Sequence, residues 1–168
     1  MEFQKKHKSF LASLYFILMA LLVSKAIDYL LNEIFIHLVS NYSLVKGGFK
    51  PNFKNINQIV KAVFKVIIFI PLIETALFQY FIINLLKTSE RFEKNEVLII
   101  IISAFLFALS HYYSIYYIII TFFAGCILAY SFLASKNFKI KPFWLVFTIH
   151  ALFNLISFLV EFYQYRYS

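Results

Sequence analysis

Five long apolar stretches restrict this chain to very few folds. They cover residues 9–39, 58–86, 97–113, 115–134 and 142–163, and short polar or charged segments separate them. An α-helix rises 1.5 Å per residue, so about 20 residues cross the roughly 30 Å hydrocarbon core of a bilayer. Within lipid the backbone must satisfy its own hydrogen bonds, and a helix does so inside a single segment. The stretches therefore predict an all-α, polytopic transmembrane helix bundle with about five spans.

The composition excludes an ordinary soluble domain. Of the 168 residues, 62% are hydrophobic and 14% are charged, against about 45–50% and about 25% in soluble domains. A soluble core of this size cannot bury so much apolar surface, whereas a bilayer solvates it. No repeat or low-complexity linker divides the chain. We therefore expect one transmembrane domain over residues 1–168, with a motif-bearing core at about residues 58–163.

The first stretch leaves its number of crossings open. Residues 9–39 are long enough for one tilted helix, or for a span followed by an amphipathic piece. Within the stretch, Lys25 and Asp28 stand one helical turn apart, and we expect them to pair with each other. Two adjacent glycines and a proline predict a loop at about residues 40–57.

The net charge of +8 comes from the segments between the stretches. The N-terminus, residues 87–96 and residues 135–141 each carry three basic residues, whereas the opposite side carries four in all. Because cytoplasmic loops are enriched in Lys and Arg, five spans place the N-terminus in the cytoplasm and the C-terminus outside. A second span in the first stretch would reverse only the N-terminus. Charge that flanks spans is not a nucleic-acid-binding face, so the expected partner is the lipid bilayer and no nucleic acid is expected.

Three groups of residues inside the apolar stretches carry chemistry. They are Glu74 with Thr75 and Gln79, His111 with Phe107, and His150 with Asn154. Polar groups in hydrocarbon cost several kcal/mol unless they are paired or face a cavity. Residues four apart share one face of a helix, as His111 does with Phe107 and His150 with Asn154. Polar faces on three helices can converge only in the bundle interior.

A carboxylate, two imidazoles and a carboxamide in one small space can activate a water molecule. Glu74 can serve as general base, while His111 and His150 can bind a divalent metal or stabilise a developing oxyanion. Asn154 can orient an imidazole or donate to the oxyanion. Two other interpretations stay open. The polar groups can be interhelical hydrogen bonds that hold the bundle together, or they can mark a transport pathway strung across the bilayer.

The same residues resemble the motifs of a known family. They occur in P-L-I-E-T-A-L-F-Q at 71–79, F-A-L-S-H at 107–111 and H-A-L-F-N at 150–154, and A-G-C-I-L-A-Y lies at 124–130. In order, spacing and membrane setting they are similar to E-E-x-x-x-R, F-x-x-x-H and H-x-x-x-N/B of the CPBP family. These proteins are CAAX prenyl endopeptidases and bacteriocin-processing intramembrane metalloproteases, and the resemblance covers about residues 65–158.

The resemblance implies an intramembrane endopeptidase that hydrolyses a membrane peptide or a lipidated protein substrate. By position, Glu74 matches the base that activates water. His111 and His150 match the histidines implicated in metal or oxyanion binding, and if they bind a divalent metal, the resemblance implies zinc. Asn154 matches the final asparagine. We expect a multi-pass integral membrane protein, in the plasma membrane of a bacterium.

Two positions depart from the family pattern. Thr75 stands where the family has its second glutamate, and Gln79 stands where it has arginine. A glutamate and an arginine four apart can form a buried ion pair, and loss of only one would leave an unpaired charge in low dielectric. Thr75 and Gln79 can hydrogen-bond at the same spacing, so we interpret them as a coordinated neutral replacement. The alternative is a catalytically inactive family member that acts as a membrane binding, immunity or scaffold protein.

Overall fold

The structure, a computed structural model, describes residues 2–38, 53, 55–138 and 140–167, with side chains from residue 11 onward. The described residues form helices and turns and contain no strand. Four helical segments among them are long and apolar enough to cross a membrane: Leu11–Leu38, Ile56–Lys87, Ile115–Asn137 and Pro142–Tyr167. The fifth apolar helix, Glu96–Leu109, is shorter. The polytopic all-α bundle is confirmed. The predicted loop at 40–57 lies mostly outside the described residues.

The first apolar stretch forms one helix, α1 (Glu2–Leu38), and not two. The predicted pair is present, because Lys25 Nζ lies 3.5 Å from Asp28 Oδ2. The same ammonium group donates a hydrogen bond of 2.5 Å to Ser157 Oγ on the last helix. A charged pair inside the first span thus also connects α1 to the C-terminal helix.

The second stretch is one continuous helical run with two π-helical parts. It consists of α2 (Ile56–Val63), η2 (Phe64–Phe69), α3 (Ile70–Glu74), η3 (Thr75–Ile82) and α4 (Ile83–Lys87). Its start is fixed by Asn55, whose side chain accepts a hydrogen bond from the Asn57 N–H. Pro71 has no N–H to donate to the preceding turn, and η2 ends just before it. Glu74 therefore closes a short α-helical turn between two π-helical segments, which are frequent at functional sites.

The remaining elements are α5 (Glu90–Glu93), α6 (Glu96–Leu109), α7 (Ile115–Ala134), η4 (Ser135–Asn137) and α8 (Pro142–Tyr167). The predicted span at 97–113 is too long at its C-terminal end. Ser110 stops α6, and its hydroxyl donates to the Phe107 carbonyl. Ser114 starts α7 by accepting the Tyr117 N–H. Serines favour such capping contacts over a helix interior, so residues 110–113 form a turn.

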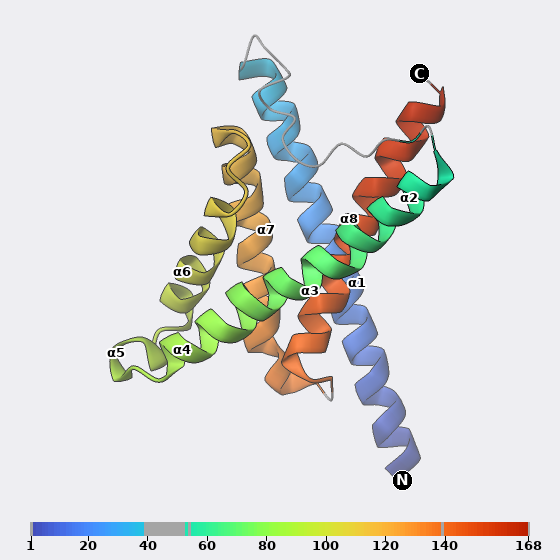
Figure 1. Cartoon of the computed structure of the whole chain (residues 1–168). Coiled ribbons are helices and arrows are strands. Elements are labelled where there is room, and N and C mark those ends of the chain that lie inside the picture. Colours follow the sequence, from blue (N-terminus) through green and yellow to red (C-terminus); the bar gives the residue numbers. More distant parts are fainter. Residues whose placement is uncertain (1, 39–52, 54, 139, 168) are drawn as a thin grey trace.

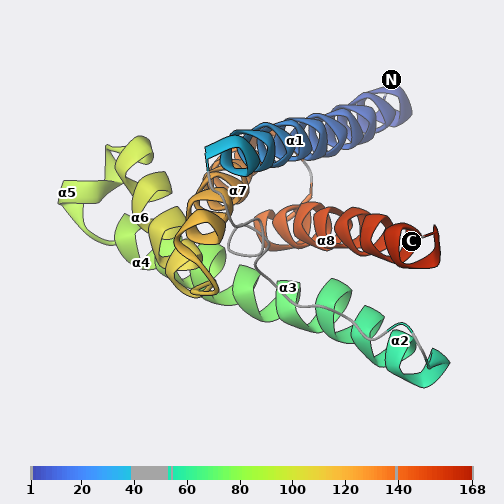
Figure 2. The same ribbon diagram turned by 90° about the horizontal axis from the view of Figure 1, so that it is seen from above.

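Figures 1 and 2 show how the helices lie. In Figure 1 the run from α2 to α4 crosses the other helices diagonally. Seen from above in Figure 2, α8 lies between α1 and this run, and it packs against both. α6 and α7 form a hairpin and pack along each other. The core lies between these elements, and its largest buried side chains include Ile83, Ile99, Leu145 and Ile149.

The outside of the bundle is apolar, as a bilayer requires. Large hydrophobic side chains are exposed on every long helix, among them Leu22, Phe64, Phe123 and Leu159. Close contact between α6 and α7 depends on Gly125. A Cβ atom there would lie 2.9 Å from Phe107 Cδ1 and 3.0 Å from the Ala104 Cα. The glycine thereby lets Phe107 occupy its buried position beside the polar residues.

Candidate active site

The carboxylate of Glu74 lies between imidazoles from two other segments. Its Oε1 is 3.6 Å from His111 Nε2, and its Oε2 is 3.5 Å from His150 Nε2. The three side chains keep exposed fractions of 16%, 15% and 6%, in that order, so Glu74 and His111 remain reachable from outside the core. The structure thus brings all three predicted groups together at one point.

The ring of His111 has a fixed orientation. Its Nδ1 lies 2.9 Å from the Phe107 carbonyl and 3.0 Å from Ser110 Oγ. A carbonyl only accepts, so Nδ1 carries a proton, and Nε2 faces Glu74. His111 was expected on the helix, but it lies in the turn just after α6, because Ser110 ends the helix first. The four-residue spacing to Phe107 nevertheless survives as this hydrogen bond.

Phe107 lies among the site residues as an apolar support. It is nearly fully buried, with ring centroids 4.6 Å from His111 and 5.6 Å from His150. Phe78 packs edge-on against its other side at 5.7 Å. His150 is itself buried, and its Nδ1 has no hydrogen-bond partner. The His150 proton is therefore free to reside on Nε2, the atom that faces Glu74.

Asn154 makes a different contact from the one expected. Its Nδ2 donates a 2.9 Å hydrogen bond to the carbonyl of Val66 in η2. In the π register Ile70 N–H bonds to the Lys65 carbonyl, so the next N–H in line would reach Val66. That residue is Pro71, which has no N–H. Asn154 thus satisfies a carbonyl that the proline leaves unpaired, and it holds α8 against the run that carries Glu74.

This contact predicts a coupling between Asn154 and Pro71. Asn154→Leu should lower the free energy of unfolding by about 1 kcal/mol, since it leaves a carbonyl unpaired inside the membrane. Pro71→Ala supplies the missing N–H and should recover much of that loss in the Asn154→Leu background. Denaturation of the four proteins in detergent measures the coupling as a double-mutant cycle. Strictly additive effects would show that the Val66 carbonyl does not join the two positions.

Thr75 and Gln79 do not form the expected hydrogen-bonded pair. Both side chains are fully buried. Thr75 Oγ1 and both polar atoms of Gln79 lack a hydrogen-bond partner in the structure, so that expectation is wrong. The two residues lie in η3, where the π-helical turn changes which side chains share a face. The four-residue spacing that aligns them on an α-helix therefore does not bring them into contact.

The unpaired hydroxyl of Thr75 leads to a stability prediction. Thr75→Val keeps the shape and removes a buried, unbonded polar group, so it should raise the free energy of unfolding by about 1 kcal/mol. Thr121→Val is the matched control, because the Thr121 hydroxyl donates to the carbonyls of Tyr117 and Ile118. That variant should not gain stability. A loss for Thr75→Val, measured by denaturation in detergent, would mean that its hydroxyl has a partner.

A small enclosed cavity lies beside the two imidazoles, with a volume of about 50 Å³. Its polar lining residues are Ser24, His111, Tyr117, Thr121, His150 and Asn154. One water needs about 10–15 Å³ of such space, so the cavity has room for a few water molecules. Glu74 does not line the cavity, but it lies beside His111 and His150, which do. Water molecules in this cavity would therefore lie beside both imidazoles.

Tyr117 is not among the candidate residues of the sequence. It lies in the run H-Y-Y-S-I-Y-Y at 111–117, and such tyrosine-rich runs are typical of the bilayer interface. Tyr112 and Tyr113 are indeed exposed, at 83% and 63%. Tyr117, however, lines the cavity, and its ring centroid lies 5.9 Å from that of His111. A usable signal was Thr121 one turn later, which places two hydroxyls on one face of α7.

The types of donor atom at the site suit a metal ion, but the distances between the side chains do not. Two imidazoles and a carboxylate form a donor set that catalytic zinc uses, and the His111 bond to a backbone carbonyl is typical of a metal-binding histidine. Among the residues that the structure describes, no group of three His, Cys, Asp or Glu side chains is placed to hold a metal ion. The zinc ion therefore stays a prediction.

Comparison with known proteins identifies the family. A family model described as type II CAAX prenyl endopeptidase Rce1-like matches residues 56–156, which is more than half of the chain. Searches of curated proteins and of solved structures returned no match. The matched residues include Glu74, His111, His150 and Asn154, the residues discussed above. The chain therefore belongs to the Rce1-like family of type II CAAX prenyl endopeptidases and is an integral membrane protein.

Proposed function

We propose that this protein hydrolyses a peptide bond of a membrane-associated or lipidated substrate inside the bilayer. One observation carries the proposal: the Glu74 carboxylate lies within 3.6 Å of the Nε2 atoms of both His111 and His150. Purely structural polar contacts would not need a carboxylate and two imidazoles at one point. The family assignment supports the same reaction class.

In the proposed reaction Glu74 is the general base. It takes a proton from a water molecule as the water oxygen attacks the peptide carbonyl carbon, and it later returns that proton to the leaving amine. His150 donates from Nε2 to the oxyanion that develops on the carbonyl oxygen. His111 already carries its proton on Nδ1, so its Nε2 cannot donate to Glu74 and is free to accept the second hydrogen of the attacking water. Asn154 is a positioning residue, since its amide bonds to Val66 and not to the reacting groups.

Metal binding by the two imidazoles is proposed only as a second role. His111 and His150 are the residues that would hold a zinc ion, which supplies a Lewis acid for the carbonyl oxygen when bound.

We also propose the plasma membrane of a bacterium as the location. The substrate route that we propose leads to Glu74 and His111, because these two side chains keep some exposure while His150 is buried.

A pair of matched peptides tests this function. The purified protein in lipid vesicles receives a farnesylated peptide that ends in C-a-a-X, and the same peptide without the farnesyl group. We expect cleavage of the farnesylated peptide at a rate at least about tenfold higher, since the lipid concentrates it in the bilayer. Mass spectrometry identifies the products. Cleavage of neither peptide would contradict the hydrolase, and equal rates would contradict a lipidated substrate.

The alternative is an inactive family member with a binding, immunity or scaffold role. The specific observation that favours it is that Thr75 and Gln79 replace the family's second glutamate and arginine without restoring their pairing. The same assay decides between the two, because an inactive member cleaves neither peptide while its fold stays intact. Retention of Glu74 between both histidines favours the hydrolase.

A further inference from the structure

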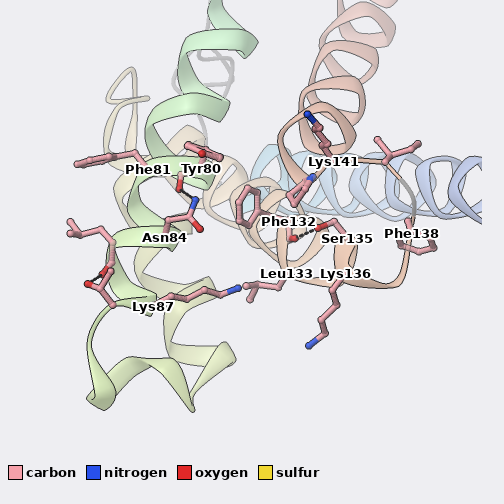
Figure 3. A pocket seen from close by; sticks show the side chains of 14 residues that line it. Tyr80, Phe81, Asn84, Lys87, Phe132, Leu133, Ser135, Lys136, Phe138 and Lys141 are labelled. Atoms are coloured by element: carbon pink, nitrogen blue, oxygen red, sulfur yellow. Dashed lines mark hydrogen bonds between the residues drawn. The ribbon is translucent and has the colours of Figure 1, made fainter.

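A large groove lies at the end of the bundle that carries the charged segments. It has a volume of about 770 Å³ and runs between η3 and α4 on one side and the α7–η4–α8 connection on the other. Figure 3 shows its side chains, with Lys87 extending from the α4 side toward Leu133. None of Glu74, His111 and His150 lines the groove. Its size falls in the range of about 300–1,000 Å³ typical of ligand sites.

The charge of the groove is positive and only partly neutralised. Three lysines line it: Lys87, Lys136 and Lys141. Lys136 Nζ lies 2.9 Å from Glu96 Oε1 and is therefore paired. Within the described part of the chain, neither Lys87 nor Lys141 makes an ion pair, although the Lys87 charge also acts on the Glu96 carboxylate. Three lysines beside one carboxylate leave the groove with a net positive charge, which favours a ligand with a negative charge.

Three other polar groups of the groove each already donate one hydrogen bond within the chain. The Asn84 amide donates to the Tyr80 carbonyl at 2.7 Å, and the Thr88 hydroxyl donates to the Leu85 carbonyl at 2.7 Å. The Ser135 hydroxyl donates to the Phe132 carbonyl at 2.6 Å. The second N–H of Asn84 and the Tyr80 hydroxyl can also donate to a ligand in the groove. The charge of the lysines is what favours an anion over a neutral polar ligand.

The walls of the groove are apolar and open to lipid. Tyr80 and Phe132 pack edge to face at 6.2 Å, and Phe138 extends the wall toward α1 through a 4.8 Å contact with Phe16. Phe81 and Leu85 are exposed at 57% and 53%, on a helix long enough to span the membrane. An acyl chain that lies against this wall would stay in contact with the bilayer. An acidic soluble peptide has no acyl chain to place there, so the apolar wall favours a lipid.

We propose that this groove binds an anionic phospholipid. Lys87 and Lys141 attract the phosphate of the head group, and an acyl chain lies against Tyr80, Phe81 and Phe132. The distribution of loop charge places this end of the bundle in the cytoplasm, where anionic lipids are concentrated. Basic pockets between helices on this side bind such head groups in other membrane proteins. The site is independent of peptide hydrolysis.

Lipid titration of the purified protein tests the proposal. In a neutral detergent, native mass spectrometry compares binding of phosphatidylglycerol with that of phosphatidylcholine. The wild-type protein should bind phosphatidylglycerol about tenfold to thirtyfold more tightly, as about 1 kcal/mol per lysine implies. The double variant Lys87→Gln/Lys141→Gln should bind the two lipids equally. Arg91→Gln/Lys94→Gln removes two exposed charges from the adjacent α4–α6 segment without touching the groove, and it should keep the preference.

Three outcomes would overturn the proposal. An equal loss in the Arg91→Gln/Lys94→Gln control would show that diffuse surface charge is responsible. Displacement of the lipid by an equal concentration of inorganic phosphate would show an anion site without lipid recognition. Displacement by an acidic peptide, with no preference between the two lipids, would assign the groove to a protein partner. Circular dichroism of each variant confirms that its helices are retained.

Discussion

Glu74→Gln is expected to reduce the rate of peptide cleavage by about 10²- to 10⁴-fold, the range attributed to a general base. Glutamine has the same shape but cannot accept a proton from water at neutral pH. The bundle should persist, because neither carboxylate oxygen makes a close hydrogen bond that folding depends on. The cleavage assay in vesicles measures the rate, and denaturation in detergent measures the fold.

Glu96→Gln is the matched control for the loss of a carboxylate. Glu96 is exposed and pairs with Lys136, and it lies at the start of α6, far along the helix from the His111 turn. Its replacement should leave cleavage unchanged. Wild-type cleavage by Glu74→Gln would eliminate Glu74 as the base, and an equal loss in both variants would point to a general effect of charge.

The second large effect is expected at the two histidines. His111→Asn and His150→Asn should each lower the cleavage rate by about 10²-fold or more, since each removes the imidazole that faces Glu74. His37→Asn is the control, because His37 is exposed near the end of α1. It should cleave like the wild-type protein. Cleavage at the wild-type rate by either site variant would remove that residue from the mechanism.

Metal analysis of the same variants separates the two roles proposed for the imidazoles. If the histidines act as zinc ligands, zinc bound to the purified protein falls with activity in both site variants, and a chelator has the same effect on the wild-type protein. If they stabilise the oxyanion directly, activity falls while metal content does not change. His37→Asn again provides the baseline for metal content.

The spans, and the meeting of Glu74 with both histidines, could be predicted from the sequence because they depend on local pattern. Apolar runs set the helices, and a carboxylate and histidines inside them are rare enough to stand out. The pairing of Lys25 with Asp28 followed from their spacing on one helix. The predicted end of α6 is four residues too late. Ser110 and Ser114 lie on either side of a turn, and their capping hydrogen bonds depend on the three-dimensional structure.

The misjudged contacts all depend on π-helical register or on neighbouring helices. The expected pairing of Thr75 with Gln79 assumed α-helical geometry, which η3 does not have. The hydrogen bond from Asn154 on α8 to Val66 depends on Pro71, which lies five residues after Val66 in the run from α2 to α4. The spacing of residues on α8 alone therefore does not reveal it. Tyr117 became part of the cavity only because the turn after α6 brings α7 beside His111. None of these contacts can be read from spacing on a single ideal helix.

The most direct measurement is the mass of the cleavage product formed in water enriched in oxygen-18. The wild-type protein in vesicles is given the farnesylated C-a-a-X peptide, beside Glu74→Gln under the same conditions. Our account predicts that the wild-type product carries one oxygen-18 in its new carboxylate, and that the variant leaves the peptide intact. An intact peptide with both proteins, or the same labelled product from both, would contradict hydrolysis by a water molecule that Glu74 activates between His111 and His150.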